Sequence, residues 1–587
     1  MTGTPTAKAA PGPTGGETNV AGDAPVATID HRRVLVVVVG LLLGMLLAAL
    51  DQTVVATALP TIVGDLGGAS HIAWIVTAYL LASTVSTPLW GKLGDLYGRK
   101  WFFQAAIVIF LVGSAMSGLS QTLGMLIVFR AIQGLGAGGL IVGAQAIIGD
   151  VVSPRERGKY QGLFGAVFAV TTVIGPLLGG FLTQHASWRW VFYLNLPLGA
   201  VALVVTAAVL PSDQVRIKRV VDWTGSVLLT LSVTALILVA SLGGITFAWG
   251  STPIITLAVV GVVLLGVWAL VERRATEPIL PLKLFANRVF SAASAIGFVV
   301  GFALFGAVTF LPVFLQVAKG TDPTMSGLQL LPLMLGMLVT SVVSGFLISR
   351  WGRYKVFPVV GSALMTLGLF LLSTVTATTP DLLMYLDMVV MGLGLGGVMQ
   401  VLVIAVQNAV DHRDLGVATA GATFFRSIGG SFGTAVFGAI FANVLVSRLA
   451  SDLHGIRIPK NLGSSVNPGL LAHLPPAIHH GVTSAYSSTI DTVFLVSVPI
   501  SAAAFLLTFL LPEIHLRTHA GAGPEAGGAG GAPDADRPSS GPPDVVTASL
   551  PLPVDGVPEP AGTGPAGVPE PAGAPGAPVV TGLELAE

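Results

Sequence analysis

Long apolar stretches, separated by short polar turns, run along most of the chain. Fourteen such stretches lie near residues 34–57, 72–90, 101–119, 122–148, 160–182, 190–210, 222–242, 252–271, 289–315, 325–348, 356–375, 381–408, 416–445 and 490–511. Most of them approach the roughly 20 residues that a helix needs to cross about 30 Å of hydrocarbon. The pattern predicts an all-α membrane protein with 14 transmembrane helices in a lipid bilayer.

A charged decapeptide, residues 91–100, separates the second and third stretches. It contains three cations, one acid and three glycines. Such a segment cannot lie in hydrocarbon, because its charges and its turn need water or protein partners. The apolar stretches on either side therefore leave and re-enter the bilayer at this turn.

The composition is typical of a membrane protein and excludes several classes of functional site. Hydrophobic residues make up 53% of the chain and charged residues only 10%, whereas soluble domains carry about a quarter of charged residues. The chain has no cysteine, which excludes disulfides, thiolate metal sites and cysteine nucleophiles.

The positions of the cations predict the orientation in the membrane. Of the 29 lysines and arginines, 20 fall in the N-terminal tail or in loops after even-numbered stretches, and five fall in loops after odd-numbered stretches. Cytoplasmic loops carry the excess of Lys and Arg. We therefore expect a multi-pass protein of the plasma membrane with both termini in the cytoplasm.

Three segments outside the apolar stretches are expected to lie in water. Residues 1–33 and 512–587 are rich in Pro, Gly and Ala, which is typical of disordered tails, and we place both in the cytoplasm. The first 30 residues have no apolar core and do not resemble a cleaved signal peptide. Residues 446–489 are expected to form an external loop before the last helix.

The external loop contains four scattered histidines. Histidine is a common metal ligand, and a metal site there is one interpretation. Scattered loop histidines are more often solvated polar residues, and we favour that interpretation and expect no metal. The four residues are His454, His473, His479 and His480.

The chain repeats itself in parallel. The turn at residues 345–354 matches the decapeptide at two glycines, a leucine and an arginine, and the glycine-rich string 134–139 recurs at 392–397. Helices 9 to 14 therefore resemble a second copy of helices 1 to 6. We expect two parallel six-helix bundles, 34–210 and 289–511, with two inserted helices and their flanking loops at 211–288.

Five motifs together resemble those of the major facilitator superfamily, and specifically of its fourteen-helix drug:proton antiporter group. The resemblance covers about residues 34–511 and includes the helix 4 and helix 5 motifs. The motifs occupy residues 50–60, 91–100, 130–136, 175–180 and 188–197. The resemblance implies alternating access between two rocking bundles, with the proton gradient as energy source and no cofactor.

Asp51 and Arg130 are the first candidates for proton coupling. No histidine or lysine falls within an apolar stretch, so a proton carrier in the membrane must be a carboxylate. Asp51 lies 17 residues after Val34, about 25 Å along a helix, and Arg130 enters from the opposite direction to a similar depth. The two could meet. The resemblance also associates Arg130 with proton transfer, whereas the alternatives are a helix cap at Asp51 and a purely structural ion pair.

Asp387 and Arg426 form a second candidate pair for proton coupling. Asp387 lies within a stretch, and Arg426 lies about ten residues into another, near the middle of the membrane by helical rise. In the internal alignment Arg130 falls on the neighbour of Asp387, so the pair is not a symmetry copy of the first. The alternative for Asp387 is a cap near the outer end of its helix.

Glycine motifs in the stretches are interpreted as packing and hinge elements. Gly134–Gly139 has spacing similar to a dinucleotide-binding loop, but it follows no strand, and glycine allows close helix approach instead. The helix 5 motif consists of Gly175, Pro176, Gly179 and Gly180. Pro176 breaks the hydrogen-bond ladder, so it predicts either a hinge for alternating access or a static kink.

The decapeptide itself is a candidate conformational switch, through Gly91, Asp95, Gly98 and Arg99. An acid near a helix N-terminus and a cation near a C-terminus each contribute roughly 0.3–1 kcal/mol, enough to bias a two-state equilibrium. We expect Asp95 and Arg99 to make contacts across the cytoplasmic face in one state only. The alternative is that these charges only set the topology.

These observations predict a proton-coupled exporter of small lipophilic organic compounds, such as drugs or antibiotics, working by alternating access. The expected partners are the small-molecule substrate, protons and the bilayer, without nucleic acid, and we expect a monomer. The alternatives are an exporter dedicated to one endogenous metabolite and, less favoured, a nutrient importer. An enzyme is not expected, because the stretches contain no catalytic constellation.

Overall fold

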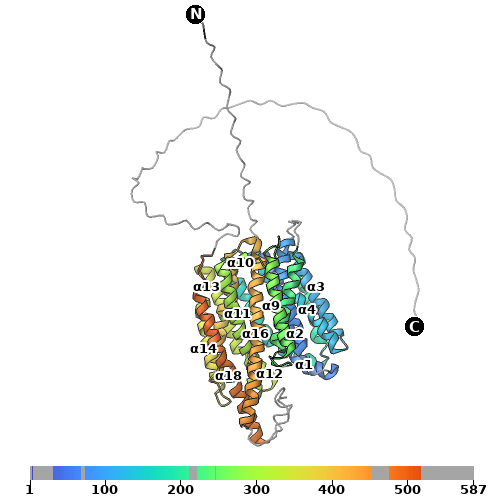
Figure 1. Ribbon diagram of the computed structural model, residues 1–587, viewed down its shortest axis with the longest axis vertical. Helices are drawn as coiled ribbons and strands as arrows, with labels where there is room; N and C mark the ends of the chain where they lie inside the picture. Colours follow the sequence, from blue (N-terminus) through green and yellow to red (C-terminus); the bar gives the residue numbers. More distant parts are fainter. Residues whose placement is uncertain are drawn as a thin grey trace, which may run out of the picture. The chain divides into compact units, whose positions relative to one another are not determined.

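The computed structural model describes Gly3 and residues 31–67, 73–210, 221–244, 246–452 and 475–516. The helices, which belong to one structural unit spanning Met1–Pro524, are shown in Figure 1. They are α1 His31–Leu66, α2 Ala73–Tyr97, α3 Arg99–Leu119, α4 Leu123–Val151, α5 Arg157–His185, α6 Trp190–Tyr193, α7 Asn195–Val209, α8 Trp223–Leu242, α9 Thr252–Glu272, α10 Lys283–Ala286, α11 Arg288–Val317, α12 Pro323–Gln329, α13 Leu331–Trp351, α14 Val356–Leu372, α15 Asp381–Ala409, a 3-10 turn η2 His412–Asp414, α16 Leu415–Asp452 and α18 Pro476–Phe509.

The protein is an all-helical membrane protein. Each of the fourteen predicted stretches overlaps one or more helices. Within the described residues, twelve helices or helix pairs are long and apolar enough to cross a membrane. Of the other two predicted stretches, one is α2, which does not meet these criteria, and the other is α14, an apolar helix of 17 residues.

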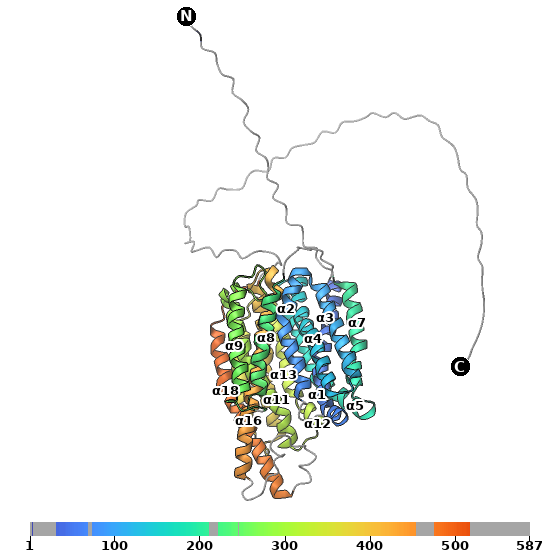
Figure 2. The ribbon, with the colours of Figure 1, turned by 45° about the vertical axis from the view of Figure 1, so that its right-hand side comes forward.

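The last two long helices correct the prediction of an external loop at 446–489. α16 continues to Asp452 and α18 begins at Pro476, so both ends of this segment are helical. The two helices extend beyond their neighbours as a hairpin (Figure 2). Apolar residues at helical spacing, including Leu445, Leu449 and Val482, pack together there, and this packing extends the helices past the apolar stretches. His479 and His480 lie near the start of α18, whereas His454 and His473 lie outside the described residues.

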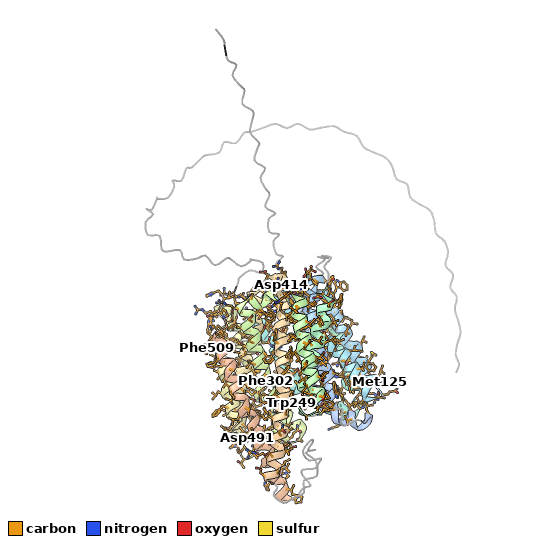
Figure 3. All side chains as sticks on the ribbon, in the orientation of Figure 1. Met125, Trp249, Phe302, Asp414, Asp491 and Phe509 are labelled. Atoms are coloured by element: carbon orange, nitrogen blue, oxygen red, sulfur yellow. The ribbon has the colours of Figure 1, made fainter. Side chains whose placement is uncertain are left out.

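Both predicted tails lie almost wholly outside the described residues, and so do the loop cations near residue 216. The described part of the chain has one end where α2 meets α3 and α4 meets α5. We call it the basic end, because Lys92, Arg99, Lys100 and Arg155 gather there. Asp414, labelled in Figure 3, lies at this end, whereas Asp491 lies towards the opposite end.

Helix α4 packs between α2 and α3 through its glycine-rich string. A Cβ atom added to Gly138 would lie 2.5 Å from the carbonyl oxygen of Ser83 in α2. One added to Gly136 would lie 2.5 Å from the backbone nitrogen of Phe110 in α3. Real side chains cannot come this close, so glycine is what allows the three backbones to approach.

Helix α15 repeats this packing between α13 and α14. A Cβ atom on Gly396 would overlap the carbonyl oxygen of Met337 in α13, and one on Gly394 would overlap the backbone nitrogen of Met365 in α14. The two glycine-rich strings therefore have the same neighbours in the same order. This packing supports the internal repeat that the sequence predicts.

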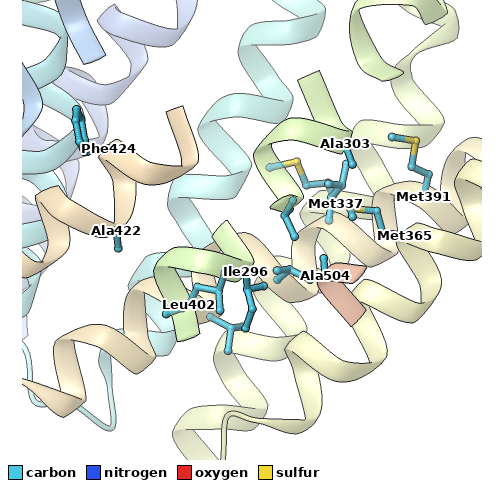
Figure 4. Packing of buried hydrophobic residues seen from close by; sticks show 14 of the residues in the cluster. Ile296, Ala303, Met337, Met365, Met391, Leu402, Ala422, Phe424 and Ala504 are labelled. Carbon is cyan, nitrogen blue, oxygen red and sulfur yellow. The ribbon is translucent and has the colours of Figure 1, made fainter. Parts of the chain in front are cut away.

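The largest apolar cluster lies mainly among α11, α13, α14, α15, α16 and α18 and extends to α8. Its buried side chains interdigitate between these helices (Figure 4), and Met337, Met365 and Met391 are labelled among them. Methionine has a flexible, unbranched side chain that fills irregular gaps between helices. A separate buried cluster, which includes Met45, Phe103 and Leu140, joins α1, α3 and α4.

Replacing Gly136 by alanine should destabilise the protein by about 1–3 kcal/mol, because α3 and α4 must separate to admit the methyl group. The matched control is Gly266→Ala in α9, where the added Cβ meets nothing within 4 Å and where the better helix propensity of alanine should stabilise the protein by up to about 1 kcal/mol. Unfolding of both purified variants in detergent measures the difference. Equal stability of the two variants would contradict the close packing of α4.

Candidate functional site

Asp51 of α1 and Arg130 of α4 form a buried ion pair. Arg130 Nη1 lies 2.5 Å from Asp51 Oδ2, and the two side chains are 1% and 0% exposed. The helices run in opposite directions, so residues from distant parts of the chain reach the same depth. The two residues therefore meet, as their predicted depths indicated.

Two amide side chains complete the surroundings of the carboxylate. Gln133 Nε2 donates to Asp51 Oδ1 over 2.8 Å, and Asn195 Nδ2 donates to the same oxygen over 3.0 Å. Gln133 Oε1 also accepts from Arg130 Nη1 over 2.7 Å. Gln133 thus bridges the acid and the base, and Asn195 brings the start of α7 into the same network.

An aromatic ring supports the cation. The Cζ atom of Arg130 lies 4.1 Å from the centroid of the Tyr79 ring in α2, a distance at which a cation is attracted to the ring face. The Tyr79 hydroxyl donates to the carbonyl oxygen of Ala48 over 3.1 Å. Four helices, α1, α2, α4 and α7, therefore supply this cluster.

Sequence reasoning missed part of this cluster. Gln133 and Asn195 lie within the quoted motifs, but no role had been assigned to them. Tyr79 lies in no quoted motif, and its only signal is a tyrosine inside an otherwise apolar stretch. Buried charges need such partners, because removing them from water costs several kcal/mol per ion.

The helix 5 motif packs directly on the α1 segment that follows Asp51. A Cβ atom on Gly175 would overlap Thr53 Oγ1, and one on Gly179 would lie 2.7 Å from the carbonyl oxygen of Val54. α5 continues through Pro176 as far as His185. A Cβ atom on Gly180 would meet nothing within 4 Å. Two of the three glycines therefore couple α5 to the helix that carries the buried acid.

Asp95 connects α2 to the N-terminus of α16 at the basic end. Its carboxylate accepts from the backbone nitrogens of Gly416, over 3.0 Å, and Val417, over 2.7 Å. Free N–H groups and the helix dipole make this terminus favourable for an anion. Gly91, one turn earlier, allows the contact, because a Cβ there would lie 2.7 Å from the carbonyl oxygen of Gly416.

Arg99 fixes the orientation of Asp95. Its Nη2 lies 2.7 Å from Asp95 Oδ1, and its Nη1 lies 2.5 Å from Asp150 Oδ1 at the end of α4. Gly98 gives the turn between α2 and α3 a φ of 98°, which residues with a Cβ rarely adopt. All four residues of the predicted switch thus take part in one turn that contacts α16.

The second copy of this turn contacts α5 differently. Gly345 of α13 lies directly against Gly158 of α5, because a Cβ on either would overlap the carbonyl oxygen of the other. Arg155 Nε donates to the carbonyl oxygen of Ser349 over 2.9 Å, and its Nη2 to that of Arg350 over 3.0 Å. α2 against α16 and α5 against α13 therefore form two related interfaces at the basic end.

A layer of buried polar side chains lies between α4, α15 and α16 near the same end. Gln407 Nε2 donates to the carbonyl oxygen of Gln145 over 3.0 Å and to Thr419 Oγ1 over 3.1 Å. Thr423 Oγ1 lies 3.3 Å from Gln145 Oε1. These bonds link the N-terminal and C-terminal repeats across their interface.

The second predicted pair is not joined in the structure. No hydrogen bond or ion pair links Asp387 and Arg426 within the described ranges. Asp387 is buried near the start of α15, and Arg426 is half-buried in α16, where it faces Gly297 of α11. Their part in proton coupling stays a prediction. Asp491 lies in the interior of α18, a helix that is long and apolar enough to cross a membrane.

Residues 41–434 match the sequence profile of the Major Facilitator Superfamily. The chain belongs to this superfamily. It is 44% identical over 504 residues to an uncharacterised transporter of this type from Mycobacterium tuberculosis, covering 86% of this chain and 73% of the relative. It is 36% identical over 484 residues to Multidrug resistance protein 3 of Bacillus subtilis, covering 81% of this chain and 94% of the relative. The match to this multidrug relative supports the multidrug-type group of the superfamily that the motifs indicate.

The fold agrees with that of solved transporters. The crystal structure of the human organic anion transporter MFSD10 superposes with a TM-score of 0.54 at 15% identity, covering 82% of this chain and 99% of that structure. An identity this low establishes the shared fold alone. This transporter therefore has the helical architecture of its superfamily, with the Asp51 cluster formed by helices of the N-terminal repeat.

Removing either charge of the buried pair should destabilise this transporter strongly. Asp51→Asn or Arg130→Met alone should cost about 3–5 kcal/mol, because each leaves one uncompensated buried charge. The double variant should cost less than the sum, as measured by equilibrium unfolding in detergent. The control is Lys283–Asp414, a surface pair 2.7 Å apart whose lysine is 56% exposed, for which a coupling of about 0–1 kcal/mol is expected. Additive effects at Asp51 and Arg130 would contradict the pairing.

Proposed function

We propose that this transporter exports small lipophilic organic compounds in exchange for protons. The observation that carries the proposal is the buried Asp51–Arg130 pair with its complete set of hydrogen bonds. Burying an ionised carboxylate in a membrane costs free energy unless the group has a function or a partner. The partner of Asp51 is the single positive charge of Arg130, and one proton on the carboxylate would release it. The similarity to a relative named for multidrug resistance supports the export of drug-like compounds.

The proposed topology has fourteen crossings, with α2 and α14 added to the twelve apolar spans. α2 ends within the decapeptide, at Tyr97, and the polar residues of this part lower the hydropathy of the helix. With this topology the basic end lies in the cytoplasm, in agreement with the positive-inside rule. Residues 34–210 and 289–511 are the two rocking bundles, one chain forms the transporter, and the proton gradient serves in place of a cofactor.

Protonation of Asp51 is the proposed coupling step. A proton on the carboxylate removes the charge that holds Arg130 Nη1, and Gln133 Oε1 then remains as an acceptor for that nitrogen. Arg130 can therefore shift without losing all its partners. Because Gly175 and Gly179 couple α5 to the same part of α1, a movement of α1 reaches α5 and its interface with α13.

The contacts at the basic end are the proposed cytoplasmic gate. Opening towards the cytoplasm requires that Asp95 release the N-terminus of α16 and that Arg155 release the end of α13. Both contacts are hydrogen bonds to backbone groups of the other repeat. Such bonds bias the equilibrium between two states and still allow each contact to break and form again in every cycle.

Transport by reconstituted protein tests the coupling. Proteoliposomes with an imposed pH gradient should accumulate cationic and neutral lipophilic compounds on the acidic side, from which the protons enter, and Asp51→Asn should reduce this accumulation at least about tenfold, since it removes the proton acceptor. The control is Asp411→Asn, an exposed carboxylate at the basic end, which should transport normally.

Full gradient-driven transport by Asp51→Asn at equal protein content would refute the coupling role. Response to one compound of the panel only would favour the exporter of a single metabolite. Accumulation in the direction of proton flow would identify an importer and overturn the proposal.

Accessibility labelling tests the gate. The chain has no native cysteine, so Ser341→Cys, buried at the interface of α13 with α5, is a unique reporter. Asp95→Asn should increase its labelling from the cytoplasmic side about tenfold, because a charge-assisted hydrogen bond contributes about 1.5–3 kcal/mol. Asp411→Asn should leave the rate unchanged. An unshifted rate in Asp95→Asn would exclude Asp95 from the gate.

A further inference from the structure

Two carboxylates that the transport proposal does not use converge at the basic end of the inserted helices. Asp222 precedes α8 and Glu272 ends α9. A Cβ atom added to Gly225 would overlap Asp222 Oδ2 and lie 2.8 Å from Glu272 Oε2. Both oxygens therefore border the same point, and glycine at 225 is what leaves room for them.

The two facing oxygens accept no hydrogen bond from the described part of the chain. Each carboxylate uses its other oxygen: Asp222 Oδ1 accepts from the backbone nitrogen of Gly225 over 2.8 Å, and Glu272 Oε1 accepts from that of Leu280 over 2.6 Å. Asp222 Oδ2 and Glu272 Oε2 are buried and make no hydrogen bond to the described residues. Glu272 is only 2% exposed and Asp222 is half-buried, so bulk water screens the two buried facing oxygens little.

A second polar group without a partner lies nearby. Trp268 is one helical turn before Glu272 on the same face of α9, it is 7% exposed, and its buried Nε1 has no acceptor among the described residues. The segment around Glu272 therefore contains both orphaned acceptors and an orphaned donor. Native proteins leave few such groups, and those that occur call for an explanation.

Among the residues that the structure describes, the cation whose charge acts on Glu272 already has another partner. This cation is Lys92 of α2, and its Nζ is held 2.8 Å from Glu277 Oε2 in the turn after α9. The other charged groups around α8, α9 and α16 are exposed or paired with each other: Arg273 and Arg274 are exposed, and Lys283 lies 2.7 Å from Asp414. Two like charges on neighbouring carboxylates whose facing oxygens are buried disfavour full ionisation of both.

We propose that Asp222 and Glu272 form a proton-binding site distinct from Asp51, in which one proton is shared between Asp222 Oδ2 and Glu272 Oε2. The proton makes a carboxyl–carboxylate hydrogen bond and removes the repulsion between the oxygens. It holds the start of α8 against the end of α9. These two helices lie side by side, and α8 lies next to α2 (Figure 2).

The site is linked to the predicted switch turn. Glu277 lies five residues after Glu272, and its ion pair with Lys92 connects the turn after α9 to the decapeptide in α2. Loss of the shared proton makes the two carboxylates repel and loosens the turn that positions Glu277. The site therefore senses protons at the basic end and acts on α2 from the inserted helices.

Infrared spectroscopy of the purified full-length protein, without substrate, tests the site directly. At neutral pH the spectrum should contain the carbonyl stretch of one protonated carboxyl group that disappears in Glu272→Gln and equally in Asp222→Asn. The intensity of the carboxyl band lost in the double variant should be no greater than that lost in either single variant, because the two residues share one proton. Glu277→Gln is the control and should keep the band, since Glu277 is paired with Lys92.

Thermal unfolding gives a second readout. The folded protein holds a proton that the unfolded chain releases at neutral pH, so raising the pH removes this contribution to stability. The Tm of the wild type should therefore fall relative to that of Glu272→Gln by at least about 2 °C between pH 6 and pH 9. In the Glu272→Gln variant, the introduced amide donates permanently to Asp222 and has no proton to lose.

Four results would overturn the proposal. In the infrared spectra, these are a carboxyl band that is unchanged in both single variants, and a loss in the double variant that equals the sum of two carboxyl bands. In thermal unfolding, they are a Tm difference between wild type and Glu272→Gln that stays constant across the pH range, and a Tm of the wild type that rises with Mg²⁺ or Ca²⁺ while that of Glu272→Gln does not. The last result would indicate a metal site. Asp222→Asn and Glu272→Gln are measured in parallel, so the test does not depend on one variant folding. Because no transport is measured, failure of this site and failure of the Asp51 mechanism are distinguishable.

Discussion

Close approach of helix backbones is the constraint on which the rest of the structure depends. In a bilayer the lipid tails are as apolar as the side chains, so helices associate through packing and hydrogen bonds rather than through burial of apolar surface from water. Here the packing is between backbones, at Gly136 and Gly138 in one repeat and at Gly394 and Gly396 in the other. This tight framework places Arg130, one turn before the glycines of α4, at a fixed distance from α1. The charge cluster is therefore a consequence of glycine packing as much as of the charged residues themselves.

Much of the fold could be predicted from the sequence, because apolar stretches of membrane length leave few alternatives to helices. The contact between Asp51 and Arg130 also followed, since helical rise alone sets the depth of each residue. Depth does not specify which way a side chain points around its helix. For this reason the same reasoning suggested a pair between Asp387 and Arg426, which the structure does not join within its described part.

Other features of the structure depend on contacts between helices, which the pattern of apolar residues along the sequence does not reveal. Tyr79 is one aromatic residue among many, and only the three-dimensional position of α2 brings its ring to Arg130. Asp222 lies at the start of one apolar stretch and Glu272 at the end of the next, so α8 and α9 separate them in the sequence. Their approach is therefore set by the packing of α8 against α9. The extensions of α16 and α18 also lie outside the prediction, because polar residues interrupt the apolar stretches there while apolar residues such as Leu445, Leu449 and Val482 still recur at helical spacing.

The two interfaces at the basic end use opposite poles of the helices that they contact. Asp95 binds the N–H groups at the start of α16, and Arg155 binds carbonyl groups at the end of α13. In both, the N-terminal repeat supplies the side chain and the C-terminal repeat supplies only backbone. Side-chain changes in these parts of the C-terminal repeat therefore leave the hydrogen bonds intact as long as the helix ends stay in place, except at Gly345 and Gly416, where a Cβ atom would overlap the N-terminal repeat. Most of the sequence at these two helix ends is thus unconstrained by the contacts, whereas the N-terminal repeat must keep both its acid and its arginine.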